Sequence, residues 1–190
     1  QPVPQLTINI PIGLRFRDNP DNITSNSSLE VQSGQSLSLI GGDVNLNGGL
    51  LAAPEGRVEL GGLAEAGKVG FNPDGSLTFP NNVARGNVTL SNQANVSVIG
   101  QRGSITVNAR NLDISTGSGL FAGIPSGANS DAQAGDIVIN ATDRVRIEGD
   151  SNSSIFIINV PLVGKAGDIV INTSILEGTG RFLIGSGAFG

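Results

Sequence analysis

The sequence predicts an all-β protein, a parallel β-helix made of stacked three-stranded coils. The segment AGDIVIN at 134–140 returns unchanged at 166–172, 32 residues later, and a looser copy, RGSITVN, lies at 102–108. Apolar residues recur in pairs at i and i+2, which is the period of a strand with one buried face. Glycine, asparagine and serine separate the pairs. A fixed period of this length is typical of stacked repeats rather than of a single globular core.

The first residues predict short strands and a loop. Leu6–Ile10 alternates apolar and polar residues and predicts a strand, which Pro11 ends. Leu14 and Phe16 indicate a second short strand. Residues 17–28 are polar and rich in turn formers, which predicts a loop. We therefore expect edge or capping strands and a polar loop over residues 1–28, followed by the β-helix over residues 29–190, which stops at the end of a coil.

From Leu29 onward the strand pattern becomes regular. Strands this short hold two or three inward side chains each, so none is stable alone and they must stack. Glycine interrupts the chain too often for helices, and Leu60–Ala66 is the one stretch that predicts a helical turn. The apolar pairs are Leu29/Val31, Leu37/Leu39, Val44/Leu46, Val58/Leu60, Val69/Phe71, Leu77/Phe79, Val88/Leu90, Val96/Val98, Ile105/Val107, Leu112/Ile114, Ile137/Ile139, Val145/Ile147, Ile155/Ile157 and Ile169/Ile171.

One coil can be followed residue by residue. A strand begins after Gly103, residues 109–111 turn the chain, and residues 112–114 form a second strand. Residues 119–124 form the third strand, and a long loop, Pro125–Ala134, returns to the next repeat. Three strands and three turns predict a triangular cross-section. Coils differ in length, because the unit that starts at Gly86 reaches Gly103 after only 17 residues.

Stacking in register predicts columns of like residues. Parallel strands lie about 4.8 Å apart, so equivalent side chains of successive coils touch. An asparagine column can bond along the axis because its amide both donates and accepts. Hairpins remain an alternative, since Asn47-Gly48 and Asp74-Gly75 are tight-turn sequences. The predicted columns are Ile105/Ile137/Ile169, Val107/Ile139/Ile171 and Asn108/Asn140/Asn172.

Composition excludes several functions. The chain has 11 basic and 16 acidic residues, a net charge of −5, which argues against a nucleic-acid partner. No apolar run approaches the roughly 18 residues of a membrane-spanning helix, so no membrane insertion is expected. Cysteine and histidine are absent. Their absence removes thiolate and imidazole from metal binding and general-base catalysis. We expect no catalytic residues, no metal site and no cofactor.

Two surfaces are candidates for ligand contact. Arg144 and Arg146 alternate with buried positions, beside Glu148 and Asp150. They form a polar strip that could bind an acidic sugar or simply be a solvated outer face with weak ion pairs. The long loop offers further contacts at Ser126, Gly127 and Asn129, because loops on a rigid scaffold often carry function.

Asp136 and Asp168 occupy equal positions in the repeat and would stack about 5 Å apart. That spacing could make a carboxylate pair or an ion site. The favoured interpretation is that each aspartate follows a glycine at the start of a strand and bonds to the local backbone.

Two segments carry a resemblance to a known family. Residues 41–63 (GGDVNLNGGLLAAPEGRVELGGL) and 112–123 (LDISTGSGLFAG) resemble large cyanobacterial exoproteins of the filamentous haemagglutinin type. These are the secreted partners of two-partner secretion systems. The resemblance implies a right-handed β-helix, recognition of an N-terminal secretion domain by an outer-membrane transporter, and an extracellular, cell-surface location. It also implies adhesion or haemagglutination without catalysis, through a cell-surface glycan or protein receptor.

The position within such a protein is also predicted. The secretion domain of that family carries short Asn-Pro-Asn motifs, and the nearest segments here are Asn19–Asn22 and Asn72–Gly75. We therefore expect the chain to lie downstream of the secretion signal or across its end. Alternatives are a carbohydrate-binding or carbohydrate-active β-helix, or part of the secretion domain itself. An uncovered coil end presents unpaired strand groups and predicts end-to-end self-association.

Overall fold

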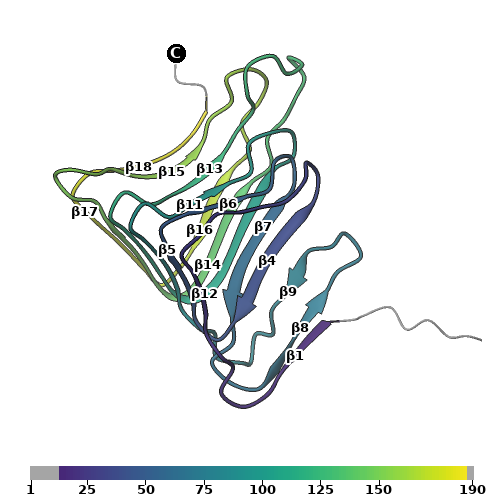
Figure 1. Ribbon diagram of the computed structural model, residues 1–190, viewed down its shortest axis with the longest axis vertical. Coiled ribbons are helices and arrows are strands. Elements are labelled where there is room, and N and C mark those ends of the chain that lie inside the picture. Colours follow the sequence, from purple (N-terminus) through teal and green to yellow (C-terminus); the bar gives the residue numbers. More distant parts are fainter. Residues whose placement is uncertain (1–12, 188–190) are drawn as a thin grey trace, which may run out of the picture.

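The computed structural model describes residues 13–187 and confirms the predicted parallel β-helix (Figure 1). The strand predicted over residues 6–10 lies outside the described residues. The coils enclose a triangular interior, and a small antiparallel sheet stands beside them. The six strands of one sheet mark six successive coils in the described part of the chain.

Each complete coil contributes one strand to each of three faces, and the last described coil contributes β17 and β18. The first face contains β4 (Ser36–Gly41), β7 (Arg57–Gly62), the first parts of β12 (Ser104–Ser115) and β14 (Ile137–Glu148), and β16 (Ile169–Asn172). The second contains β2 (Ile23–Ser25), β5 (Val44–Asn47), β10 (Val88–Ser91), the second parts of β12 and β14, and β17 (Ile175–Thr179). The third contains β3 (Leu29–Glu30), β6 (Leu50–Ala52), β11 (Asn95–Ser97), β13 (Gly119–Ala122), β15 (Ile155–Asn159) and β18 (Phe182–Ser186).

The corner between the first and second faces is a bend rather than a loop. The turn predicted at residues 109–111 proves to be an irregularity inside β12, where the register with β14 shifts between Ala109 and Asn111. In earlier coils the same corner is crossed by glycines. A Cβ on Gly62 or Gly86 would overlap the carbonyl oxygen of Gly42. The glycines of the sequence therefore allow successive backbones to meet at this corner.

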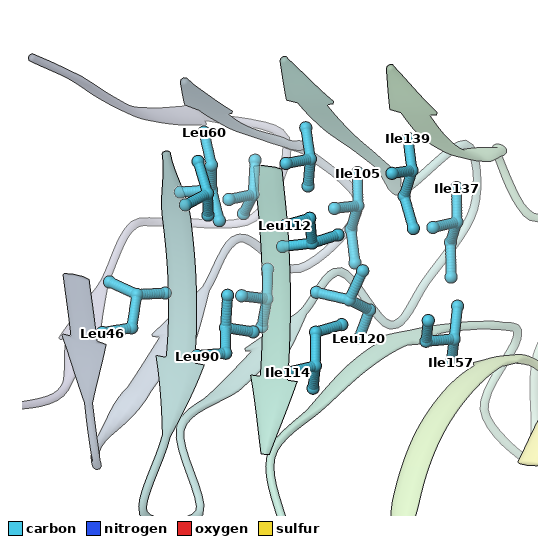
Figure 2. Packing of buried hydrophobic residues seen from close by; sticks show 14 of the residues in the cluster. Leu46, Leu60, Leu90, Ile105, Leu112, Ile114, Leu120, Ile137, Ile139 and Ile157 are labelled. Atoms are coloured by element: carbon cyan, nitrogen blue, oxygen red, sulfur yellow. The ribbon is translucent and has the colours of Figure 1, made fainter. Parts of the chain in front are cut away.

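The predicted interior columns are confirmed. Ile105 pairs with Ile137, which pairs with Ile169 one coil further on. Val107, Ile139 and Ile171 stack in the same way. Figure 2 shows inward leucines and isoleucines from all three faces meeting in one continuous core. The stacking explains how strands of only a few residues become stable, because each buried side chain touches its counterparts in the neighbouring coils.

Two polar columns run along the helix. In the predicted one, the Asn140 amide donates to Asn108 Oδ1 at 3.2 Å, and the Asn172 amide donates to Asn140 Oδ1 at 2.9 Å. A second column, which the repeat did not reveal, precedes the strands of the second face. In that column the Asp43 N–H donates to Asn22, Asn87 donates through its backbone and side-chain N–H groups to Asp43, and the Asn111 amide donates to Asn87.

The β-helix is interrupted once, between β7 and β10, by a segment that forms antiparallel strands and that we call the antiparallel excursion. It contains β8 (Gly67–Phe71) and β9 (Leu77–Thr78), and β8 also pairs with β1 (Gly13–Phe16). Asp74-Gly75 forms the hairpin between β8 and β9, so the hairpin alternative holds here. Asn47-Gly48 instead turns the corner between β5 and β6.

The helical turn predicted at Leu60–Ala66 is wrong. Residues 60–62 end strand β7, and Leu63 pairs with Arg85 across the base of the excursion. The small antiparallel sheet packs against the outer side of the first face, where Leu63, Val69 and Phe79 are buried. Figure 1 shows β1, β8 and β9 beside β4 and β7. This sheet is therefore a second, separate layer on one side of the β-helix.

Candidate functional site

The arginine strip forms on the outer side of the second face. Arg144 lies opposite Asn111, and Arg146 lies opposite Asp113, in the parallel pairing of β12 with β14. Together with Thr89, Ser115 and Glu148 they line a shallow hollow of about 220 Å³. Two polar atoms in it, Asp113 Oδ1 and Arg144 Nε, are buried without a hydrogen-bond partner. The structure thus brings both predicted arginines into one surface depression.

The charge of Arg146 in this strip is compensated by its neighbours. The Arg146 guanidinium donates to Glu148 Oε1. Its neighbours in the register are Asp113 on one side and Glu177 on the other. An arginine flanked by carboxylates has little positive potential left for an outside anion. Arg146 is therefore compensated as on a solvated outer face, whereas Arg144 lies between Asn111 and Ile175 and has no carboxylate opposite it in the register.

The predicted loop contacts lie elsewhere. Ser126, Gly127 and Asn129 are exposed in the connection between β13 and β14, at the corner between the third and first faces. Asn129 Oδ1 accepts the Asp131 N–H at 3.0 Å, which closes the loop on itself. Beneath the loop, Ile124 is buried with two alanines. Because that corner is opposite the second face, the loop and the arginine strip do not form one site.

Asp136 bonds to the start of the equivalent strand in the next coil. Asp136 Oδ1 accepts the backbone N–H of Asp168 at 2.8 Å across one coil step. The carboxylate therefore satisfies a backbone donor of the next coil, where the favoured interpretation expected a bond to the local backbone. Among the described residues, no group of three or more acidic side chains is gathered closely enough to hold a metal ion.

A charge cluster around the buried Glu59 joins the antiparallel sheet to the β-helix, and sequence reasoning missed it. Glu59 points outward from β7 yet is only 2 % exposed, because β9 covers it. Its two carboxylate oxygens accept the Leu77 N–H at 3.2 and 3.1 Å. Arg57 Nε lies 3.8 Å from Glu59, and Arg57 Nη2 lies 3.6 Å from Asp74 in the hairpin. The outward alternation of Arg57 and Glu59 was the available signal, but nothing local showed what would cover them.

The two carboxylates of this cluster have opposite pKa shifts with different causes. Desolvation raises the pKa of Glu59, and the Leu77 N–H and Arg57 oppose that rise only in part. The pKa of Asp74 is lowered, chiefly because it accepts hydrogen bonds from the side chain and backbone of Ser76. The cluster connects the antiparallel sheet to the first face of the β-helix.

Comparison with protein families decides the identity of this architecture. The model of the TPS secretion domain matches residues 1–107, more than half of the chain. The chain belongs to the TPS secretion domain family. The TPS match covers the antiparallel sheet, β2 to β11 and the first part of β12. No curated protein and no solved structure gives a match.

Membership corrects one prediction and supports others. The TPS match excludes a position wholly downstream of the secretion signal. It agrees with the other expected position, across the end of the secretion domain, because residues 108–190 follow the matched part. The family is that of two-partner secreted, haemagglutinin-type exoproteins. Its domains are recognised by an outer-membrane transporter during export, and the proteins are secreted across the outer membrane. They are typically non-catalytic.

Within residues 13–187, no helix has the length and hydrophobicity that a membrane crossing needs.

Proposed function

We propose that this chain is the export and folding module of a large adhesive exoprotein. Residues 1–107 are recognised by the transporter, and the coils that follow begin the β-helical shaft. The observation that supports this proposal is the continuity of β12. It pairs with β7 and β10 of the TPS domain on one side and with β14 of the repeat on the other.

This continuity gives the TPS domain a physical role in folding. A single coil buries too few side chains to be stable, whereas a finished coil offers a row of backbone N–H and C=O groups to the next. The first coils are strengthened by the antiparallel sheet and by Glu59, and β12 then presents their edge to β14. If the chain is exported unfolded and then folds one coil at a time, the first coils must offer an exposed strand edge to which the next coil can add.

The experiment is transporter-dependent release. The chain, with a signal peptide for the inner membrane, is produced in a Gram-negative host together with its cognate two-partner transporter. We expect protein in the medium only with that transporter. The controls are an unrelated two-partner transporter and the cognate transporter without its periplasmic modules. Equal release in all strains, or retention in all of them, overturns the proposal.

We also propose that the parent exoprotein acts in adhesion or haemagglutination at the cell surface, without catalysis. The Arg144–Arg146 strip and the loop residues Ser126, Gly127 and Asn129 remain its predicted contacts. Glycan-array binding and red-cell agglutination by the purified chain test this, with R144A/R146A as the first variant. If binding is unchanged in this variant and in a variant with a substituted loop, these residues are not part of the contact surface.

End-to-end association of the purified chain remains a proposal. In the last described coil, Ile175 and Leu176 on β17 are 46 % and 54 % exposed. Light scattering over a concentration series tests it, with I175S/L176S as the variant expected to lose this association. A monomer at all concentrations contradicts association.

A further inference from the structure

The outer side of the third face carries an apolar surface without charge. The parallel pairing from β6 to β18 sets two outward rows of side chains across successive coils, and none of the ten residues in them is charged. An outward row of the second face, by contrast, contains Asp113, Arg146 and Glu177. The two rows of the third face are Leu50, Asn95, Gly119, Phe156 and Leu183, and Ala52, Ser97, Phe121, Ile158 and Gly185.

Strand β15 is apolar on both of its sides. Its inward residues, Ile155 and Ile157, are fully buried in the core. A strand with one solvated side alternates apolar with polar residues, as Val145–Glu148 does in the second face. A nearly continuous apolar run is instead typical of a strand that is covered on both sides. In β15 and just after it, every second residue on the outward side is apolar, namely Phe156, Ile158, Val160 and Leu162.

The described part of the chain leaves this surface open to solvent. The antiparallel sheet lies against the first face and not against the third (Figure 1). Leu162 is 72 % exposed and Leu183 is 40 % exposed. Phe121 and Phe156 are half-buried, and their rings lie 6.4 Å apart and form one apolar surface. We call Phe121, Phe156, Ile158, Leu162 and Leu183 the third-face patch.

We propose that two copies of this chain associate side by side through their third-face patches. Each chain carries a net charge of −5, so two copies repel one another across most of their surfaces. On the third face an approach brings no like charges of the two rows together. A symmetric contact places the same patch of each copy against the other, and an apolar patch is complementary to itself.

This contact goes beyond the proposed function, because export and the start of folding do not require it. It also differs from end-to-end association in the part of the molecule that it uses. Side-by-side association buries outward side chains of the third face, whereas end-to-end association uses the strand edges of the last coil.

The size of the patch sets the strength of the contact. Strand spacing and rise per residue give a surface of about 20 by 20 Å from β6 to β18, which is about 400 Å² on each copy. A permanent dimer buries about 800 Å² on each partner. The patch therefore fits a weak dimer that depends on concentration. Copies held close together at one cell surface would still pair, because their effective concentration is high.

Other occupants fit the patch less well. An anionic polymer finds no cation in the two outward rows. An anionic membrane surface repels a chain of net negative charge. A second copy needs no complementary charge and supplies the apolar surface that the patch lacks.

Sedimentation equilibrium of the whole 190-residue chain over a concentration series measures the association. We expect a reversible monomer–dimer equilibrium that persists in I175S/L176S, the variant of the coil end. We expect F156S/L162S to raise the dimer Kd at least about tenfold, because a few apolar anchors carry most of the binding energy of an interface. The control F71S/V170S removes one aromatic and one aliphatic side chain that are each 40 % exposed elsewhere. Its Kd should stay within about twofold of the unaltered chain.

L162E provides a second variant that does not depend on packing within one copy, because Leu162 is largely exposed. It should abolish the dimer, since a carboxylate buried between two apolar surfaces is left without a partner. Circular dichroism and thermal unfolding establish that each variant is folded.

A chain that is monomeric at all concentrations overturns the proposal, and binding of that monomer to phosphatidylcholine vesicles would make a lipid surface the occupant. Equal weakening in F156S/L162S and F71S/V170S overturns it too, because the contact would then be unspecific. Association that is lost in I175S/L176S but kept in F156S/L162S and L162E would belong to the coil ends alone.

Discussion

The carboxylate of Glu59 accepts the backbone N–H of Leu77 across the boundary between the β-helix and its antiparallel sheet, at 3.2 and 3.1 Å for its two oxygens. This contact joins β7, in the first face, to β9, eighteen residues later in the chain. Since Glu59 is almost fully buried, the ionisation of this side chain affects one of the contacts that attach the sheet.

The first prediction concerns pH. Burial raises the pKa of Glu59 above its ordinary value of 4.5. The folded state therefore binds this proton more tightly than the unfolded state does. The stability that this proton contributes is complete below about pH 4.5 and is lost as the pH rises through the raised pKa. We expect E59Q to remove this decline, as measured by urea unfolding at several pH values. An unchanged pH profile in E59Q would contradict the assignment.

Asp74 provides a control, because its pKa is shifted in the opposite direction. Its lowered pKa means that its contribution is present above its ordinary value of 3.8 and is lost as the pH falls through the lowered pKa. We expect D74N to reduce the acid sensitivity of the protein while leaving the decline at higher pH intact. The two variants therefore distinguish the loss of stability at low pH, which involves Asp74, from the loss at higher pH, which involves Glu59.

The second prediction tests the asparagine column. N140A leaves both Asn108 Oδ1 and the Asn172 amide without their partners. Loss of these bonds should lower the free energy of unfolding by about 1–3 kcal/mol. N172A removes one bond at a more exposed place and should cost less than about 1 kcal/mol. Urea denaturation measures both, and equal costs would show that the column does not cooperate along the axis.

The third prediction uses adjacent residues of one strand. Leu120 is fully buried in the core, whereas Phe121 lies on the outer side of β13, with its ring 6.4 Å from that of Phe156. L120A should cost about 2–5 kcal/mol because it leaves a cavity. F121A should cost about 1 kcal/mol, the contribution of an aromatic pair. Thermal unfolding provides the comparison, and a larger loss in F121A would mean that the outer face is the better packed one.

The fourth prediction concerns the glycine corner. G62A would force a methyl group against the Gly42 carbonyl, and we expect a loss of more than about 3 kcal/mol or failure to fold. G127A is the control, because nothing lies within 4 Å of its Cβ position and only its φ of +87° is unfavourable. It should cost about 1 kcal/mol. Solubility and unfolding midpoints distinguish steric overlap from backbone strain.

The regular part of the fold was predictable. Three copies with a constant spacing identify the neighbours of every residue within them, so the isoleucine columns and the column of Asn108, Asn140 and Asn172 followed from the repeat alone. The second polar column was not predictable in this way. Its links span 21, 44 and 24 residues because the antiparallel excursion lengthens one coil.

The sequence by itself therefore determined the set of stacked coils. Period-two alternation indicates which side chains face inward, and the equal repeats indicate which of them lie above one another. The tertiary structure alone decided which distant segments cover the outside. It paired β1 with β8, buried Glu59 under β9, and separated the loop from the arginine strip. The physical reason is that inward positions are set by local periodicity, whereas burial of an outward residue depends on a contact that no local pattern encodes.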